Sequence, residues 1–261
     1  MPDSGPTVAV FIPARYGSAR FPGKPLAVLA GKPLIQHVYE AVKGIPRVND
    51  IQVVTDDSRI LETVEGFGGH ACLIDSPCRT GTDRIAKAAS QTDCDVAVNL
   101  QGDEIPLHPG LLIDLIESFT KSHAQMGTLK RPLRSLEDLN QPSIVKVVTN
   151  HVGEALYFSR SSIPFLRDGN PTTPGFGFFM HLGIYIFRRD TLLRFAEMPS
   201  GILEEAEKLE QLRALENGIP IQVWETTYPS LRIDQVEDLK EATEILSKAE
   251  SFKLQVSSPR S

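Results

Sequence analysis

The sequence predicts an α/β fold in which a mostly parallel mixed sheet is flanked by helices and carries an antiparallel extension. Up to about residue 120, short apolar runs alternate with amphipathic stretches, which is typical of a parallel sheet covered on both faces. Consecutive strand-like segments then replace this alternation. With 261 residues, of which 41% are apolar, the chain is long enough to bury one large core.

The first half of the chain is predicted to alternate strand and helix from its beginning. Val8–Pro13 is short, apolar and β-branched and runs into a turn-prone segment, as expected of a buried strand. Aliphatic side chains share one helical face over about 33–43, and the apolar run 51–56 predicts the second strand. Asp57 or Ser58 is a suitable cap for the next helix. A strand over 70–74, a helix over 83–90, a strand over 96–100 and a helix over about 111–119 complete the series.

The second half is predicted to begin with strands that have no helices between them. These strands are 144–149, 155–159 and 182–187, and Gly- and Pro-rich loops separate them. An amphipathic helix over 203–216, a strand over 221–226 and a closing helix over 236–249 follow. No internal repeat and no long linker is present, which predicts a single domain.

The composition excludes several classes of function. Acidic residues outnumber basic ones by 33 to 27, giving a net charge of −6, and no long basic run could hold a nucleic-acid backbone. No apolar stretch approaches the roughly 20 residues that span a bilayer, so we expect no membrane segment. The N-terminus lacks the basic start and apolar run of an export signal, which predicts a cytoplasmic protein. Three cysteines without CxxC spacing favour neither disulfides nor a structural zinc site.

The loop after the first predicted strand carries three cations. Arg15, Arg20 and Lys24 lie in a Gly- and Pro-containing segment over 13–25. Parallel α/β sheets bind ligands at the carboxyl ends of their strands, and Arg, Lys and exposed backbone amides suit a polyphosphate. The segment has neither the Gly-Lys-Ser/Thr of a P-loop nor the GxGxxG of a dinucleotide site. It therefore predicts a phosphate site of another kind, with a solvated basic loop as the alternative.

Two aspartates are candidate magnesium ligands. Asp103 follows the strand 96–100 in the segment Leu-Gln-Gly-Asp-Glu, where Gly102 lets the backbone approach a neighbour closely. Asp234 precedes the last predicted helix. Mg2+ usually takes one or two protein carboxylates and completes its octahedron with water and phosphate oxygens. The two aspartates could thus hold one ion against a substrate phosphate, whereas each alone could be a turn former or a helix cap.

Two further segments carry polar side chains at positions typical of ligand sites. Cys78–Arg84 runs from a loop into a helix whose first amides are free donors, so it could bind a base or a sugar. Capping of that helix by Thr82 is the alternative. His181 and Tyr185 share one strand, and Leu209–Arg213 lies on the predicted amphipathic helix. A lone histidine on an apolar strand is more often structural than functional.

Taken together, these motifs resemble those of the 3-deoxy-manno-octulosonate cytidylyltransferases, the CMP-Kdo synthetases. The resemblance implies a single nucleotidyltransferase domain over 1–261, related to the A-type glycosyltransferase fold, that uses CTP and Mg2+. Roughly residues 125–190 would contribute the sugar-pocket and dimerisation subregion of a homodimer. The matching segments follow the family's order from about residue 8 to 245, and they read IPARYGSARFPGKPL, TGTDR, NLQGDE, ALYFSRSSIP, HLGIY, LEQLR and RIDQVEDL.

The resemblance also implies roles for individual residues. Contacts to the triphosphate would come from Ala14, Arg15 and Lys24, and the cytosine would be surrounded by Arg79, Thr80, Gly81 and Thr82. Mg2+ would be held by Asp103 and Asp234, which form the catalytic set together with Arg15 and Lys24. The pocket for the acidic octulosonate sugar would be lined by Gln101, Arg160, His181, Tyr185, Glu210 and Gln211. Departures from the family pattern near this pocket leave an 8-amino form of the sugar open.

The implied reaction is attack of the sugar's anomeric hydroxyl on the α-phosphorus of CTP. The products are CMP-3-deoxy-D-manno-octulosonate, for lipopolysaccharide biosynthesis, and pyrophosphate. Three alternatives stay open: a CMP-activating enzyme for another acidic sugar such as sialate, a glycosyltransferase, and a noncatalytic nucleotide-sensing module. A glycosyltransferase would carry an Asp-x-Asp metal motif beyond the first domain, and only Asp93-Cys-Asp95 has that spacing. It precedes the strand 96–100, at the wrong end for a ligand.

Overall fold

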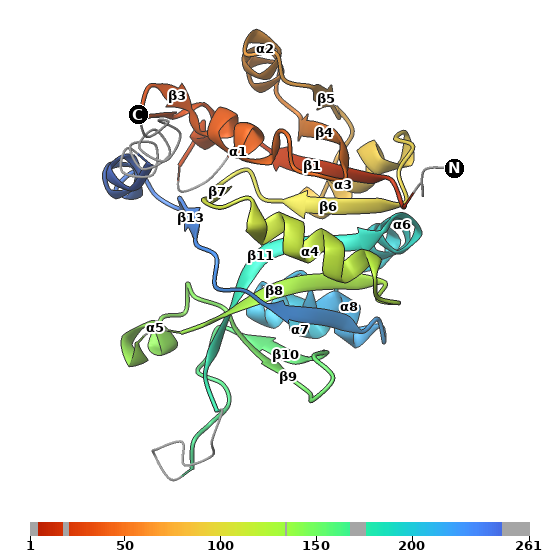
Figure 1. The fold of residues 1–261 in the computed structure, drawn as a ribbon, viewed down its shortest axis with the longest axis vertical. Helices are drawn as coiled ribbons and strands as arrows, with labels where there is room; N and C mark the ends of the chain where they lie inside the picture. The colour runs from red at the N-terminus through yellow and green to blue at the C-terminus, as the bar shows by residue number, and fades with distance from the viewer. Residues whose placement is uncertain (1–4, 18–20, 134, 168–175, 247–261) are drawn as a thin grey trace, which may run out of the picture.

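A nine-stranded mixed sheet runs through the centre of the computed structural model, which describes residues 5–17, 21–133, 135–167 and 176–246 (Figure 1). The strand order is β10-β9-β11-β6-β1-β4-β5, and β8 pairs with both β11 and β12. The parallel part comprises β1 Val8–Ala14, β4 Val48–Thr55, β5 Ala71–Leu73 and β6 Val96–Leu100. The other strands are β8 Met126–Pro132, β9 Lys146–Thr149, β10 Ala155–Ser159, β11 Phe179–Arg188 and β12 Ile221–Glu225.

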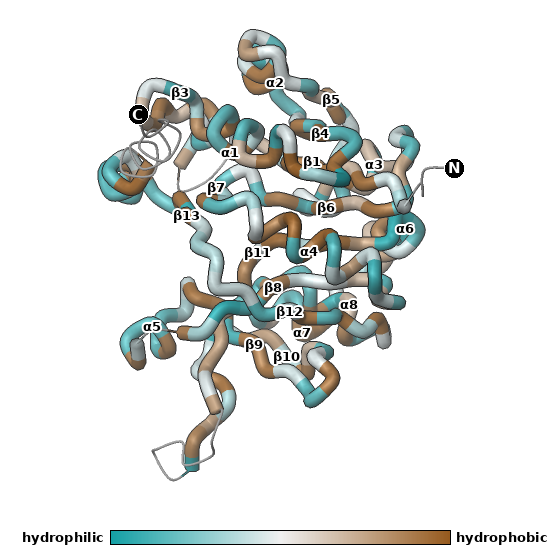
Figure 2. The backbone as a smooth tube through the Cα atoms, in the orientation of Figure 1, coloured by the Kyte–Doolittle hydropathy of each residue, from teal (hydrophilic) through white to brown (hydrophobic). Residues whose placement is uncertain are grey.

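Helices cover both faces of this sheet, as predicted. Alternate residues of β1 point to opposite faces, so Val10 and Ile12 enter one core whereas Ala9 and Phe11 enter the other. The first core is closed by α1 Leu34–Val42, α2 Ser58–Gly66 and α4 Gly110–Thr120, and the second by α3 Gly81–Ser90, α6 Arg189–Glu197 and α8 Leu212–Glu216. Figure 2 shows the apolar residues concentrated along β1, β6 and α4. The predicted α/β fold is confirmed.

Two short strand pairs lie at the carboxyl end of the parallel strands, where they shape the candidate site. The 3-10 helix η1 Lys24–Leu26 leads into the hairpin of β2 Val28–Leu29 and β3 Lys32–Pro33. Farther along the chain, β7 Glu104–Pro106 pairs in antiparallel fashion with β13 Ser230–Arg232. This second pair brings the end of the described chain back to the loop that follows β6.

The predicted helix over 203–216 is wrong, because the chain there forms two short helices. Lys208 has a left-handed backbone, with φ of 52°, and ends α7 Ile202–Glu207. The chain resumes as α8 only after Gln211. The break leaves 209–211 in a turn beside a pocket, a position that a continuous helix would not give them. The amphipathic pattern survives, since both Leu209 and Leu212 are buried.

Several elements were not predicted from the sequence. The strand β8 reads MGTLKRP, in which Gly and Pro disfavour a strand, yet Gly127 is required because Trp224 packs against it. A Cβ atom at Gly127 would lie 2.4 Å from the Trp224 ring. The short helix α5 Leu136–Asn140 and the longer α6 were also missed. The closing helix covers 238–246, so it begins two residues later than expected, and its predicted end lies outside the described residues.

Within the described ranges, no helix is long and apolar enough to cross a bilayer. Cys72, Cys78 and Cys94 are free thiols. Burial raises the pKa of the Cys94 thiol to about 11, so this cysteine is protonated at neutral pH.

Candidate active site

Tyr16 contacts Gly23 and Arg59 and so stabilises the loop after β1. The amide of Gly23 donates to the carbonyl of Tyr16 at 2.9 Å, and Gly23 has a φ of +72°, a conformation that favours glycine. The guanidinium carbon of Arg59 lies 3.4 Å from the centre of the Tyr16 ring. These contacts fix the start of η1 and thereby the position of Lys24. Arg20, the third cation of the predicted phosphate loop, lies outside the described residues.

Gly102 lets the loop after β6 pass against the end of β1. A Cβ atom at Gly102 would lie 2.8 Å from the carbonyl oxygen of Pro13, closer than real Cβ contacts. Only glycine fits this backbone approach, as the sequence predicted. Gln101 and Asp103, on either side of Gly102, are therefore held directly beside the loop that follows β1.

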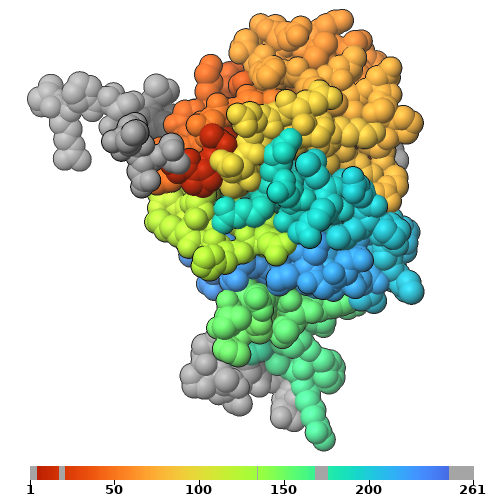
Figure 3. All heavy atoms as spheres, turned by 90° about the vertical axis from the view of Figure 1, so that its right-hand side faces the viewer, coloured from red at the N-terminus to blue at the C-terminus, as the bar shows by residue number. Residues whose placement is uncertain are grey.

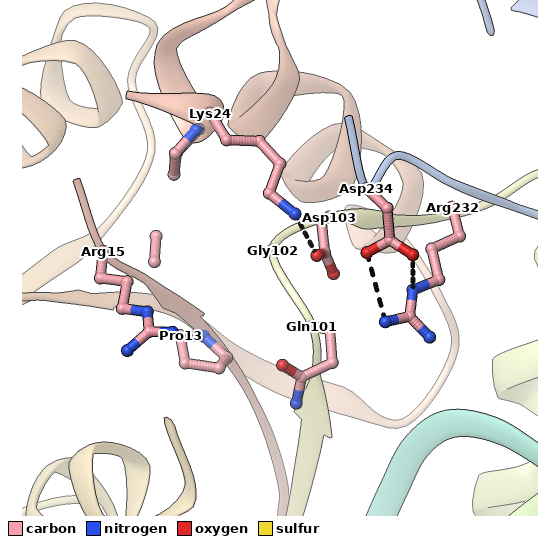
Figure 4. Close-up of a pocket in the computed structure, with 10 residues that line it drawn as sticks. Pro13, Arg15, Lys24, Gln101, Gly102, Asp103, Arg232 and Asp234 are labelled. Carbon is pink, nitrogen blue, oxygen red and sulfur yellow. Dashed lines mark hydrogen bonds and ion pairs between the residues drawn. The ribbon is translucent and has the colours of Figure 1, made fainter. Parts of the chain in front are cut away.

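The pairing of β7 with β13 brings Asp234 to the same opening as Asp103 (Figure 4). The amide of Ile233 donates to the carbonyl of Asp103 at 3.0 Å. Lys24 Nζ lies 2.6 Å from Asp103 Oδ2 and 3.0 Å from the carbonyl of Ile233, so it joins both segments. Arg232 Nε lies 3.3 Å from Asp234 Oδ2. Each carboxylate thus lies beside a cation, and both carboxylates face one space.

A first pocket opens between these segments. Arg15 lies at its rim, is exposed, and has no ion-pair partner within the described part of the chain. Three cations, Arg15, Lys24 and Arg232, and two carboxylates, Asp103 and Asp234, line the opening, which suits a ligand with several phosphate groups and a divalent ion. The lining residues are Pro13, Ala14, Arg15, Lys24, Pro25, Gln101, Gly102, Asp103, Arg232 and Asp234.

A second pocket adjoins the first and contains all six residues predicted to bind the sugar. The two pockets share Gln101, Asp103 and Arg232. The second pocket also has the cations Arg160 and Lys208 in its wall. Its lining residues are Gln101, Asp103, Glu104, Ser143, Val145, Arg160, His181, Gly183, Tyr185, Lys208, Leu209, Glu210, Gln211 and Arg232.

The course of β11 accounts for the position of the second pocket. This strand pairs with β9 at Met180 and with β6 only from Ile184 onward. Its register with β8 shifts between Leu182 and Tyr185, around Gly183. Consequently β11 passes from one neighbour to the other beside the pocket, and His181 and Tyr185 contribute to its wall.

Hydrogen bonds to Thr128 fix the tautomer of His181. The Thr128 hydroxyl lies 2.8 Å from the carbonyl of Ile184 and 2.9 Å from His181 Nε2. Because a carbonyl can only accept, the single hydroxyl proton is directed at the carbonyl, and His181 Nε2–H must donate to Thr128. Burial lowers the pKa of His181 to about 3, so the ring is neutral and its Nδ1 is an acceptor. His181 is thus suited to receive a ligand hydroxyl proton as a hydrogen bond, and is too weak a base to remove it.

Glu210 and Gln211 each have a buried polar atom without a hydrogen-bond partner among the described residues, and the Glu210 atom lies 3.8 Å from Arg213 Nη2. Glu210 Oε1 is such an acceptor and Gln211 Nε2 is such a donor among the described residues. Buried polar groups normally have partners, and both residues line the second pocket. A ligand hydroxyl could donate to Glu210 and accept from Gln211. Burial raises the pKa of Glu210 above its usual range.

Arg160 is held in place by backbone carbonyls and retains its charge for a ligand. Its Nε donates to the carbonyl of Glu207 at 2.8 Å, and Nη1 donates to that of Pro142 at 2.9 Å. The Arg160 amide donates to the Glu207 carboxylate, but no carboxylate pairs with its guanidinium within the described ranges. Lys146, fully buried, donates to the Arg160 carbonyl and stabilises this turn. A fixed cation of this kind suits a ligand carboxylate.

The four residues expected to surround cytosine lie at the N-terminus of α3. Gly81 lies beside Pro13, since a Cβ atom at Gly81 would be 3.4 Å from the proline ring. Thr80 caps the helix by accepting from the Asp83 amide at 3.1 Å, so the alternative of a Thr82 cap is wrong. Arg79 pairs with Asp83 and donates to the carbonyls at the end of α6, so its side chain is already engaged.

Three residues of the site were missed by the sequence reasoning. Arg232 lines both pockets and precedes Asp234 by two positions. Glu104 adjoins Asp103, lines the second pocket and accepts from the Ser230 hydroxyl at 2.8 Å, and burial raises its pKa. Glu104 lies in the motif NLQGDE and Arg232 in the motif RIDQVEDL, so the sequence offers a signal for both. Asn99 opens the motif NLQGDE, is fully buried on β6 and accepts from Gln101 Nε2, a contact that only the folded chain shows.

Comparisons with known proteins point to one family. A family model described as cytidylyltransferase matches residues 9–226. The chain is 46% identical over 247 residues to a 3-deoxy-manno-octulosonate cytidylyltransferase of Geobacter sulfurreducens, covering 92% of this chain and 99% of that protein. It is also 46% identical to a protein of the same name from Thermodesulfovibrio yellowstonii, covering 90% of this chain and 96% of the relative.

Two solved structures share the fold of this chain. A structure of CMP:2-keto-3-deoxy-manno-octonic acid synthetase complexed with CTP superposes with a TM-score of 0.86 at 36% identity, covering 93% of this chain and 99% of that one. A putative glucose-1-phosphate thymidylyltransferase from Bacillus anthracis has a TM-score of 0.63 at 15% identity, covering 91% of this chain and 94% of its own, and shares the fold.

Proposed function

The chain belongs to the 3-deoxy-manno-octulosonate cytidylyltransferase family, and from this premise we propose that its two pockets join CTP to an acidic octulosonate sugar with release of pyrophosphate. The single observation that carries the proposal is the residue set shared by the pockets. Gln101, Asp103 and Arg232 line both of them. A triphosphate in the first pocket and a sugar in the second would therefore meet beside Asp103, where the new bond would form.

The second pocket has the charge and the polar groups that an acidic polyhydroxylated sugar requires. Arg160, Lys208 and Arg232 supply positive charge for the sugar carboxylate. Glu210 Oε1 and Gln211 Nε2 are buried without a hydrogen-bond partner among the described residues, and a sugar hydroxyl would satisfy both. The proposed attack by the anomeric hydroxyl then depends mainly on holding this anion in line with the α-phosphorus.

The first pocket has the cations that a triphosphate requires. Arg15 is exposed at the rim, and Lys24 is held between Asp103 and the carbonyl of Ile233. In the proposed reaction both would neutralise charge on the departing pyrophosphate, because the barrier to joining two anions is largely electrostatic. The backbone beside Ala14 and Gly102 leaves room for the phosphates.

Asp103 and Asp234 fit Mg2+, which we propose as the metal. Both offer carboxylate oxygens to one space, the ligand type that Mg2+ prefers. Among the described residues no cluster of three or more His, Cys, Asp and Glu could hold a metal. An ion bound by two carboxylates would thus need phosphate oxygens and water to complete its octahedron. When bound, Mg2+ would supply positive charge at the phosphates and lower the proton affinity of the attacking hydroxyl.

Pyrophosphate release should depend on the nucleotide, the sugar and the metal together. We expect turnover with CTP, 3-deoxy-D-manno-octulosonate and Mg2+, and little with UTP or ATP. Chelation by EDTA should abolish the activity, and excess MgCl2 should restore it, because the triphosphate would otherwise repel the sugar carboxylate. A coupled pyrophosphate assay measures all of these conditions.

The same assay separates the alternative substrates. Sialate and the 8-amino octulosonate are offered in parallel with CTP. If the protein prefers either acid, that acid and not octulosonate is the substrate, and the reaction is still the transfer of CMP from CTP to an acidic sugar. Absence of pyrophosphate with every acid sugar, from a folded protein with Mg2+ present, would contradict the proposed function and favour a nucleotide-sensing module.

We also propose that the protein is a homodimer formed through the segment over 135–165. This segment exposes four large apolar side chains, Leu136, Val152, Leu156 and Phe165, between 57% and 86% accessible. Leu156 lies on β10, the last strand in the order of the sheet. Figure 3 shows this part, in green, as a projection below the body of the molecule. An exposed apolar edge strand is a surface that proteins usually cover.

The cytoplasmic location stays a prediction from the sequence.

Sedimentation velocity should give a species of twice 28.7 kDa. Leu156→Lys should shift the protein toward the monomer, since a buried lysine at an interface would be unpaired. Leu73→Lys is the matched control, because Leu73 lies on β5 at the other end of the strand order and is 46% exposed. A wild-type monomer at all concentrations would overturn the proposal.

A further inference from the structure

Four side chains form one hydrogen-bonded path from Glu210 in the second pocket to Gln101, one of the three residues that line both pockets. Thr82 Oγ1 donates to Glu210 Oε2 at 2.5 Å. Asn99 Nδ2 donates to Thr82 Oγ1 at 3.3 Å, and Gln101 Nε2 donates to Asn99 Oδ1 at 3.0 Å. The path thus connects α7–α8, the start of α3 and the loop after β6, three segments that are distant in the sequence. Asn99 is fully buried in its middle.

The chemistry of these groups fixes the direction of every bond in the path. Thr82 Oγ1 donates to Glu210 Oε2, so the single proton of the Thr82 hydroxyl is directed at Glu210. Thr82 Oγ1 can then only accept from Asn99, which must turn its NH2 group toward Thr82 and its carbonyl oxygen toward Gln101. Gln101 must therefore turn its own NH2 group toward Asn99. Its remaining oxygen, Oε1, is left for the pockets that Gln101 lines.

We propose that Asn99 is a positioning residue, which transmits the orientation set at Glu210 through Thr82 and so presents Gln101 Oε1 as an acceptor to the acid sugar. This inference rests on the proposed function and deepens it. It also assigns the Thr82 hydroxyl to a bond within the protein, so that its loss changes sugar binding as well as any contact with cytosine. Gln101 stands at the junction of the pockets, where an amide in the reverse orientation would place a donor against the sugar's hydroxyl protons.

The path is tested by steady-state kinetics of three variants. Thr82→Val keeps the shape of the side chain and removes the hydroxyl, so Asn99 and Gln101 lose their fixed orientation. We expect the KM for the acid sugar to rise about tenfold, the cost of an unpaired buried polar group. Thr82→Ser keeps the hydroxyl and should stay within about threefold of the wild type. Asn99→Ala should raise the same KM, and the double variant Thr82→Val/Asn99→Ala should raise it no further, because both changes interrupt one path.

The control and a second measurement separate this result from a loss of folding or of the proposed function. Thr191→Val makes the same change on α6 at the same exposure of 3%, away from both pockets, and should leave the sugar KM unchanged. Side-chain amide NMR signals of Asn99 and Gln101 should move in Thr82→Val without any substrate. If the wild type is inactive, the proposed function fails. If the wild type is active but Thr82→Val leaves the sugar KM unchanged, or its effect multiplies with that of Asn99→Ala, the path has no positioning role.

Discussion

Asp103→Asn is expected to lower kcat about a thousandfold while the protein stays folded. The substitution keeps the shape of the side chain and removes the negative charge that we propose for Mg2+. A metal ion at a phosphoryl centre contributes several kcal/mol, which corresponds to this loss of rate. Lys24 would lose its 2.6 Å ion pair with Asp103, but an asparagine oxygen can still accept from it. We expect Tm to fall by about 2–4 °C, as for the loss of about 1 kcal/mol.

Pyrophosphate release measures the effect, and Asp93→Asn is its matched control. Asp93 is exposed and belongs to the Asp-x-Asp spacing that a glycosyltransferase would use. Asp93 lies before β6 whereas Asp103 lies after it, so only Asp103 faces the pockets. We expect wild-type kinetics from Asp93→Asn. Wild-type turnover by Asp103→Asn, or loss of turnover by Asp93→Asn alone, would place the metal elsewhere.

Gly102→Ala is expected to lower kcat/KM about a hundredfold solely because it displaces the loop after β6. The added methyl would lie 2.8 Å from the Pro13 carbonyl, so the loop after β6 must move away from β1. Gln101 and Asp103 would move with it, and shifts of about 1 Å in reacting groups cost rates of this size. Overpacking should also lower the free energy of unfolding by about 1–3 kcal/mol. No polar or charged group is removed by this change.

Gly66→Ala is the control for Gly102→Ala. Gly66 is the last residue of α2, and a Cβ atom there would meet no neighbour within 4 Å. Its activity should equal that of the wild type, and its stability should rise slightly, because alanine restricts the unfolded chain. Equal activity of Gly102→Ala and Gly66→Ala would show that the close approach to Pro13 does not position the site.

The parallel part of the fold could be predicted because its strands are read from local sequence. The run Val8–Pro13 is apolar throughout, and the strand Val96–Leu100 is fully buried, so each signals its environment directly. The strand β8 could not be predicted in this way, since Gly127 is required by Trp224, which lies far along the chain. The break at Lys208 was missed for a related reason. An amphipathic pattern records which side is buried, and it does not record where the helix axis is interrupted.

The position of a site residue could be predicted where it belongs to a motif on one segment. It could not be predicted where the residue's role depends on contacts with other segments. All six predicted sugar-binding residues line one pocket, and Asp103 and Asp234 line the other. Asn99 and Thr128 act through bonds to residues on other strands or loops, so their part depends on the folded arrangement. Arg232 was within reach, because it stands two positions before the candidate metal ligand Asp234 in the same motif.

The β7–β13 pair determines how much of the chain must be present before the first pocket is complete. Residues near 232 complete an opening whose other walls come from the first 103 residues. A chain that ends before this segment lacks Asp234 and Arg232, and it also lacks the Ile233 carbonyl that accepts from Lys24. Translation must proceed past this late segment before the protein can turn over CTP.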